Sequence, residues 1–424
     1  MSPSRDPRTT EDPVTAGITS LRPLVPGVYL PSLLFEIGVG AVLPMIPVIA
    51  SSLGADLGTA AFIAALLPIG HILADVPAGA LAARFGDRAA MIGSSGAAVI
   101  GAVLAGLSGV TGSLAMLAIG VLLLGATEAV YGLARQSYLT EAVHPLRRAR
   151  AMSTLGGVHR IGLFIGPFAG AGLALVAGSS AAFWLAGATS LAAAAVVFST
   201  AEIAGERAPT GGAGRASMAQ VLRDNREVFA TLGVAILLIG AVRGARQVVL
   251  PLWTESLGYS PAATSLVFGI AGAVDMLLFY PAGKVMDRLG RLWVAIPSMI
   301  VMGLTLLALP LATTFASICV IAVVLGFGNG IGSGILMTLG ADTAPAEQRS
   351  QYLGIWRVFA DSGSATGPLI VSAGAAAGSL AAGIMAVGVL SAGTVAALAR
   401  WVPRWSVHAN RRTRREAGIE PGAP

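Results

Sequence analysis

The chain has 424 residues, of which 55% are hydrophobic and only 11% are charged, and its formal net charge is +6. Soluble domains carry about 25% charged residues, so a soluble fold of this size would have too little polar surface, and lipid must cover part of the chain. The basic residues lie mostly in short segments between apolar runs, which indicates membrane orientation rather than nucleic-acid binding. The single Cys319 excludes an intrachain disulfide or a thiolate metal site.

Apolar segments of roughly 18–25 residues recur along the chain, and each can cross a hydrocarbon core of about 30 Å. Because an open strand edge cannot be satisfied in lipid, these segments are predicted to be helices. No small-residue cleavage site ends the first segment, so we expect it to stay as an anchor rather than to be removed. The twelve predicted membrane helices are 26–50, 60–82, 90–109, 113–139, 151–175, 181–201, 228–252, 261–282, 292–312, 316–340, 351–373 and 379–399.

The placement of Arg and Lys predicts one orientation in the membrane. Alternate loops between the predicted helices contain no basic residue, whereas the segments on the other side are basic. The positive-inside rule therefore predicts that both termini are cytoplasmic. The expected regions are a polar N-terminal tail at 1–22, a six-helix bundle at 23–201, a cytoplasmic linker at 202–227, a second six-helix bundle at 228–400 and a solvated basic tail at 401–424.

The two predicted bundles resemble each other in sequence. The tripeptide PAG at 77–79 recurs at 281–283, and Gly86 recurs as Gly290, at the same offset of 204 (281 − 77). Two repeats of the same orientation imply two bundles around a central pathway.

Over nearly its whole length the chain resembles the major facilitator superfamily. The loop between helices 2 and 3 of that family follows the pattern G-x-L-a-D-R-x-G-R-K, whose charges are expected to clasp neighbouring helix ends in one access state. In the first copy here, Ala83 replaces the aspartate and Asp87 replaces a closing basic residue, whereas the second copy keeps the aspartate. The alternative is that these Arg residues only set topology. The residues expected to form the cytoplasmic gate are Gly79, Arg84, Gly86, Arg88, Gly283, Asp287, Arg288, Gly290 and Arg291.

The fifth predicted helix carries a Gly–Pro motif formed by Gly162, Gly166, Pro167 and Gly170. Spacing of four places the three Gly on one helical face, and Pro167 adds a bend. The motif is similar to the G-x-x-x-G-P-x-x-G-G pattern of the family's antiporters, which favours efflux; ordinary small-residue packing is the alternative. The family's Arg motif in helix 4 is missing, so a proton relay built on that Arg is not expected.

Five Arg and five acidic residues fall inside the predicted helices, where each charged side chain costs about 2.5–3.5 kcal/mol. The equal numbers predict an interior that is largely neutralised. The resemblance implies that helices 1, 4, 7 and 10 line a central cavity. The candidate cavity residues are Tyr29, Glu36, Glu128, Tyr131, Arg135, Arg160, Arg243, Arg246, Asn329 and Arg357.

The candidates for proton coupling are Glu36, Glu128, Asp275 and Asp361. A carboxyl that alternates between wet and dry surroundings can load and release a proton near neutral pH. Glu36 has no basic residue within one helical turn, which favours a functional role over a permanent ion pair.

Other charged pairs leave both a functional and a structural role open. For Glu128, a pair with Arg135 on the same helical face is the alternative to a functional role. Asp361 and Arg357, spaced by four, are interpreted as a structural pair. His71 and Asp75, also spaced by four, are interpreted as a satisfied polar contact rather than a proton relay.

The sequence therefore predicts an all-helical secondary transporter with no catalytic residue, no metal and no cofactor, driven by a proton gradient. No phosphate loop surrounds the single Lys284, and neither a G-x-S-x-G elbow nor an H-E-x-x-H motif is present, which argues against a pump or a hydrolase.

Efflux antiport of drug-like molecules is the favoured function, with an uptake symporter, a metabolite exporter and a transporter-like sensor as alternatives. The substrate is left open between amphiphilic cations and carboxylates. We expect a monomer in the bilayer of a bacterial inner membrane, with a small-molecule substrate and no nucleic-acid partner.

Overall fold

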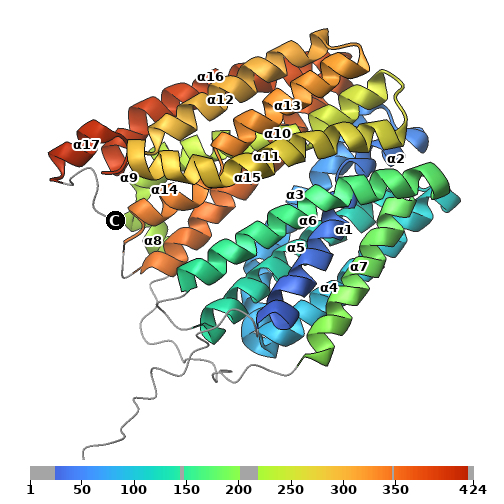
Figure 1. Cartoon of the computed structure of the whole chain (residues 1–424), viewed down its shortest axis with the longest axis horizontal. Helices are drawn as coiled ribbons and strands as arrows, with labels where there is room; N and C mark the ends of the chain where they lie inside the picture. The colour runs from blue at the N-terminus through green and yellow to red at the C-terminus, as the bar shows by residue number, and fades with distance from the viewer. Residues whose placement is uncertain (1–23, 144–147, 201–217, 346–347, 419–424) are drawn as a thin grey trace, which may run out of the picture.

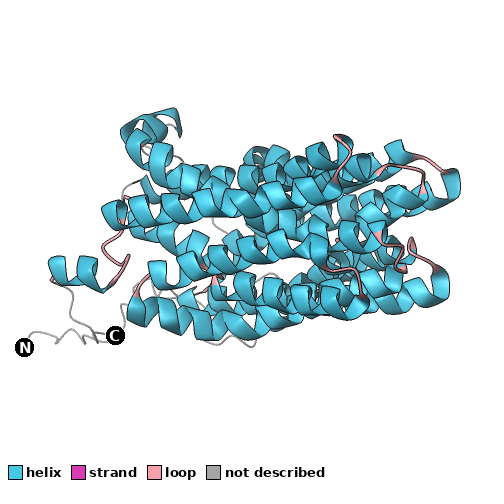
Figure 2. Ribbon diagram, turned by 90° about the horizontal axis from the view of Figure 1, so that it is seen from above, coloured by secondary structure: helices cyan, strands magenta, loops and turns pink. Residues whose placement is uncertain are grey.

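The computed structural model describes residues 24–143, 148–200, 218–345 and 348–418. All regular structure in these ranges is helical, as expected, and the long helices run side by side (Figures 1 and 2). They form two groups, which Figure 1 shows in blue to green for the first half and in yellow to red for the second.

The first half contains six membrane-crossing units. The first unit is a π-helical segment, Val25–Tyr29, followed by two α-helices that are separated at Pro44. The α-helices are α1 (Leu30–Val42), α2 (Met45–Ser52), α3 (Leu57–Phe85), α4 (Asp87–Thr111), α5 (Leu114–Ala142), α6 (Arg148–Ala177) and α7 (Ala181–Ser199).

The second half repeats this arrangement, with short helices added at its ends. A π-helical segment, Phe229–Gly233, precedes α10, and a 3₁₀ turn, Leu309–Leu311, follows α12. The predicted tenth helix is broken at residues 332–334. The α-helices are α8 (Met218–Asp224), α9 (Arg226–Val228), α10 (Val234–Ser256), α11 (Pro261–Leu289), α12 (Leu292–Ala308), α13 (Phe315–Ile331), α14 (Ile335–Thr343), α15 (Arg349–Ala376), α16 (Leu380–Trp405) and α17 (Arg411–Glu416).

Eleven helical spans of the described residues are long and apolar enough to cross a membrane. The twelfth predicted span is α15, whose 28 residues give a length of about 42 Å but which carries Arg357 and Asp361. Since α15 packs against α3, α10 and α16, its polar side chains face protein rather than lipid. The prediction of twelve helices is confirmed.

Matching signals at the ends of α3 and α11 reproduce the sequence repeat. Asp56 and Ser260 cap the two N-termini, each by accepting a hydrogen bond from the backbone N–H three residues later. Gly86 and Gly290 end the same helices with φ of 84° and 110°, a backbone conformation that side chains with a Cβ rarely adopt. The two copies therefore begin and end alike, as expected from a duplication.

The halves meet along helix pairs that take one member from each side. α3 packs against α15, and α6 packs against α11. Near the start of α3, the Ser372 hydroxyl of α15 donates to the Gly58 carbonyl at 2.7 Å. The space between the halves is the place where the polar residues of both can meet.

Candidate functional site

A cavity of about 230 Å³ lies between the two halves. Residues of α1, α2, α3, α5 and α6 line it from the first half, and residues of α10 and α15 from the second. No described residue of α13 or α14 lines this cavity, whereas the resemblance implied a lining by the tenth predicted helix. Its ionisable side chains are His71, Glu128, His159, Arg243 and Asp361.

Glu36 of α1 is buried in an ion-pair cluster within the first half. Its side chain is 1% exposed, and one carboxylate oxygen lies 2.6 Å from Arg135 of α5 and 2.8 Å from His159 of α6. Glu36 has no basic residue within one turn of α1, as stated above, but it is in the ion pair that was given as the alternative to a functional role. Spacing along α1 could not reveal partners that come from two other helices.

Glu128 of α5 lines the cavity and makes no hydrogen bond or ion pair with any side chain that the structure describes. The alternative pairing with Arg135 is wrong, because that guanidinium is bound to Glu36. Between them, Tyr131 is fully buried; its ring stacks on Phe35 at 4.2 Å and lies beneath Arg135 at 5.6 Å. The polar stripe of α5 is thus divided into a packed part and one free acid.

Four ionisable side chains form a cluster where α3 meets α15. Arg357 lies 3.7 Å from Asp75 and 3.5 Å from Asp361, and its guanidinium lies 3.0 Å from Nε2 of His71. The expected pairs of Arg357 with Asp361 and of His71 with Asp75 are both present. Ligand atoms of His71, Asp75 and Asp361 lie within 4.8 Å of one another, a grouping that could hold a metal ion, but the Arg357 guanidinium already supplies the cation.

A second cross-half cluster surrounds Asp275 of α11. Arg160 of α6 and Arg246 of α10 lie 3.5 Å and 3.6 Å from its two oxygens. Asn329 of α13 donates to the same carboxylate at 2.7 Å, so the residue expected to contact substrate is an internal hydrogen-bond donor here.

The break between α13 and α14 completes this cluster. Arg243 donates to the carbonyl of Gly332, and Arg160 donates to the hydroxyl of Ser333. The Gly332 carbonyl also accepts from the Ile335 backbone N–H at 3.3 Å, so Arg243 adds a second bond to a carbonyl in the turn that joins α13 to α14.

Tyr29 lies away from the cavity. It is buried, and its hydroxyl donates to the carbonyl of Ala151 at 3.2 Å. Its contact joins the start of the first span to α6, which assigns it to packing.

The Gly–Pro motif of α6 is the contact face with α1. A Cβ added at Gly162 would meet the side chain of Glu36, and one added at Gly166 would lie 2.6 Å from the backbone nitrogen of Ala41. Gly170 also faces Ala41, and Pro167 lies inside α6. The motif therefore holds α1, with Glu36, at backbone distance from α6.

The first copy of the gate motif contacts α7. Arg88 donates to the carbonyls of Val197, Phe198 and Thr200 at 3.1, 3.1 and 2.6 Å, satisfying the C-terminal end of that helix. Arg84 lies over the ring of Phe85.

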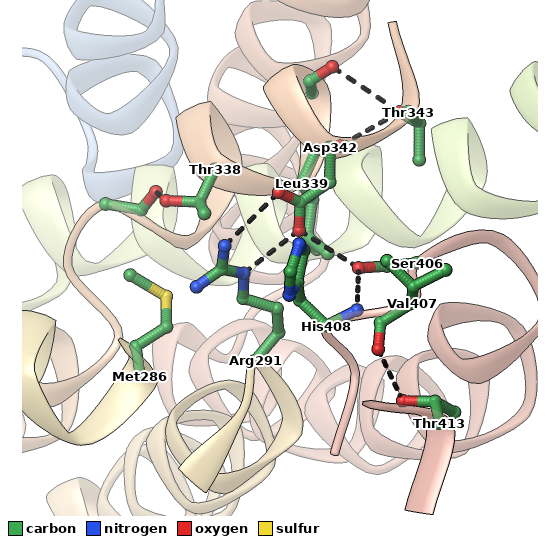
Figure 3. Close-up of polar contacts among 12 residues, drawn as sticks. Met286, Arg291, Thr338, Leu339, Asp342, Thr343, Ser406, Val407, His408 and Thr413 are labelled. Carbon is green, nitrogen blue, oxygen red and sulfur yellow. Dashed lines mark hydrogen bonds and ion pairs between the residues drawn. The ribbon is translucent and has the colours of Figure 1, made fainter. Parts of the chain in front are cut away.

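The second copy binds the end of α14 (Figure 3). Arg291 donates to both carboxylate oxygens of Asp342 at 3.0 and 3.2 Å, and Ser406 donates to the same carboxylate at 3.0 Å. Gly283 and Arg288 lie in the last two turns of α11, and the side chain of Asp287 is outside the described residues.

The basic tail docks on this second copy rather than extending freely into solvent as expected. The backbone nitrogens of Arg291 and Leu292 donate to the carbonyls of His408 and Ala409 at 3.0 Å. Arg414 of α17 donates to the carbonyls of Arg288 and Met286. Most of these contacts involve backbone N–H and carbonyl groups, so the basic composition of the tail could not predict them.

Sequence reasoning missed His159 as a partner of Glu36 and Ser333 as a partner of Arg160 in the cluster around Asp275. For Ser333 a signal exists, because the run G-N-G-I-G-S-G at 328–334 is too rich in Gly for a continuous helix. For His159 there is none within its own helix, since its partner comes from α1.

A profile of the Major Facilitator Superfamily matches residues 29–368 and 232–421 of the chain. The chain belongs to the major facilitator superfamily. It is a multi-pass membrane transporter, and its family is one of transporters rather than enzymes.

Two curated relatives align with part of this transporter. It is 27% identical over 154 residues to the multidrug resistance protein MdtH of Klebsiella pneumoniae subsp. pneumoniae, covering 36% of this chain and 38% of that protein. It is 29% identical over 156 residues to MdtH of Edwardsiella ictaluri, with the same coverage. The aligned stretch thus spans less than half of these relatives.

Solved structures share the fold at low identity. The nucleoside transporter NupG matches with a TM-score of 0.72 and 12% identity, over 88% of this chain and 98% of that one. A POT family transporter in complex with a thioalcohol-conjugated peptide matches with a TM-score of 0.71 and 13% identity, over 89% and 95%. At such identities the likeness concerns the fold alone.

Proposed function

We propose that this transporter is a proton-coupled efflux antiporter of small amphiphilic molecules, and that Glu128 carries the exchanged proton. One observation carries the proposal: Glu128 is an acid without a hydrogen-bond or ion-pair partner among the described residues, in a cavity formed by both halves.

The physical reason is the cost of an isolated charge. A carboxylate in a low-dielectric cavity without a cation bound directly to it is unfavourable, and binding either a proton or a cationic substrate removes that cost. A proton and a cationic substrate cannot bind the same carboxylate at once, so they compete for it. Exchange on opposite sides of the membrane follows if the cavity opens alternately to either side.

The other candidate acids are already compensated. Glu36 is held by Arg135, and Asp275 by Arg160 and Arg246, so protonation of either acid would leave Arg charges uncompensated. Asp361 is held by Arg357, which it shares with Asp75. Glu128 can change its protonation without that penalty.

Two features support export of drug-like molecules. The Gly–Pro motif of α6 resembles that of the family's antiporters, and the aligned relatives are named multidrug resistance proteins. We further propose a bacterial inner-membrane location with both termini cytoplasmic, from the placement of the basic residues. A monomer suffices because one chain forms the whole cavity.

The test is transport into proteoliposomes under an imposed pH gradient, with fluorescent lipophilic cations such as ethidium and rhodamine as probes. We expect uphill movement opposite to the proton flow, and loss of that movement in Glu128→Gln. Exchange of labelled for unlabelled probe without a gradient should weaken as well, because the neutral Gln cannot bind a cationic probe in place of the proton. Glu255→Gln, at the other end of α10 from the linker, is the matched control and should transport normally.

Two results would contradict the proposal. Undiminished gradient-driven transport in Glu128→Gln would remove the residue from coupling. Probe and protons moving in the same direction would show symport instead.

A further inference from the structure

Among the described residues that line the cavity, one acid and one base have no salt bridge, and they come from opposite halves. Arg243 of α10 shares the cavity lining with Glu128 of α5. Its described hydrogen bond goes to the neutral carbonyl of Gly332, and its buried Nε has no hydrogen-bond partner among the described residues. Asp275 and Asp361 of the second half have ion pairs with other Arg residues.

Other charged residues near Arg243 add to the positive charge of this wall. It interacts electrostatically with Arg160, Arg246 and Asp275, so three cations face one anion and the group has a net charge of +2. Arg246 is more than nine-tenths buried, and its Nε also lacks a hydrogen-bond partner within the described residues. A buried excess of guanidinium groups with unused donors is unfavourable until an anion arrives.

From this bipolar lining we infer that the substrate is a small zwitterion, whose ammonium group takes the place of the proton at Glu128 and whose carboxylate binds Arg243. The inference rests on the proposed exchange at Glu128 and adds the second recognition element. A purely anionic substrate would favour, rather than oppose, protonation of Glu128, whereas an ammonium group competes with the proton. The cavity of about 230 Å³ has a mostly aliphatic lining, which suits an amino acid-sized molecule with an apolar side chain.

Sets of four compounds on one skeleton test the inference by binding to purified protein in detergent, without any gradient. For phenylalanine, tryptophan and naphthylalanine, each set contains the free amino acid, its amide, its N-acetyl acid and its N-acetyl amide. Binding is measured by thermal shift and by equilibrium dialysis of radiolabelled compound. In at least one set, we expect the free amino acid to bind at least about tenfold more tightly than either singly capped form, since a charge-assisted hydrogen bond contributes about 1.5–3 kcal/mol.

Two variants should show a crossed pattern. Arg243→Gln should weaken binding of the free amino acid and the N-acetyl acid by about tenfold or more, and leave the amide unchanged. Glu128→Gln should weaken the free amino acid and the amide, and leave the N-acetyl acid unchanged. A variant that folds poorly would lose all forms alike, so the pattern separates recognition from damage. Arg412→Gln, on the exposed helix α17, is the control for a change in overall charge and should alter nothing.

Equal binding of the amino acid and its amide in every set would overturn the inference, as would no binding of any free amino acid. An Arg243→Gln variant that keeps full preference for the carboxylate would also overturn it. If the crossed pattern holds but gradient-driven transport survives in Glu128→Gln, the zwitterion site stands and the proposed proton exchange fails. If the crossed pattern is absent but gradient-driven transport is lost in Glu128→Gln, the proposed proton exchange stands and the zwitterion site fails.

Discussion

Glu36 and Arg135, on α1 and α5, form a buried ion pair with a separation of 2.6 Å, and His159 of α6 approaches the same oxygen. Three helices of the first half are therefore joined at one carboxylate. Removing one partner of a buried pair destabilises the fold, because the other partner is left charged and unpaired.

Glu36→Gln should consequently lower the free energy of unfolding. We expect a loss of about 3–5 kcal/mol, the range for breaking a buried pair, because Arg135 would keep its charge without a counter-ion. Thermal unfolding in detergent measures this as a lowered Tm, and transport should fall with or without a pH gradient. The double variant Glu36→Gln/Arg135→Gln should recover part of the stability. A normal Tm combined with selective loss of gradient-driven transport would instead make Glu36 a coupling residue.

The fold followed from the sequence because lipid restricts a span to helices and the duplication fixed the order of the elements. Even the span 351–373 within α15, which is not among the eleven most apolar spans, was predicted from the recurrence of apolar segments. The partners of the charged residues did not follow. Periodicity showed which residues share a face of one helix, such as Arg357 and Asp361, but Asp75 and Glu36 meet partners on other helices, and only packing decides which.

The close approach of α6 to α1 should depend on the missing side chain at Gly166. In Gly166→Ala the new Cβ would lie 2.6 Å from the backbone nitrogen of Ala41, and a backbone atom cannot move aside as a side chain can. Overpacking of this kind costs about 1–3 kcal/mol, so we expect a lower Tm and reduced transport.

Gly172→Ala, on the same helix, is the matched control for Gly166→Ala. A Cβ at Gly172 meets no other atom within 4 Å, so only the change in helix propensity remains, and this favours Ala. The Tm of that variant should stay equal or rise slightly. Equal losses in both variants would mean that helix backbone properties, and not the contact with α1, explain the motif.

Arg291 and Asp342 pair where the second gate motif, α14 and the tail meet. Both side chains are about nine-tenths buried, and the two guanidinium bonds leave Asp342 able to accept from Ser406 as well. Asp342→Asn should weaken all three contacts at once, because a neutral amide binds a guanidinium far less strongly than a carboxylate does. The tail would then leave its place against α11.

A thiol at Ala409, which is fully buried, reports that movement. In a background with Cys319→Ala, Ala409→Cys should resist a water-soluble maleimide and should react at least several-fold faster when Asp342→Asn is added. Glu416→Gln breaks only the exposed pair with Arg412 and should leave the thiol protected. The charge reversal Arg291→Asp/Asp342→Arg should restore protection, since the two groups then attract again. Protection that persists in Asp342→Asn would show that the backbone bonds of His408 and Ala409 hold the tail alone, and that the Arg of the gate motif has no part in docking it.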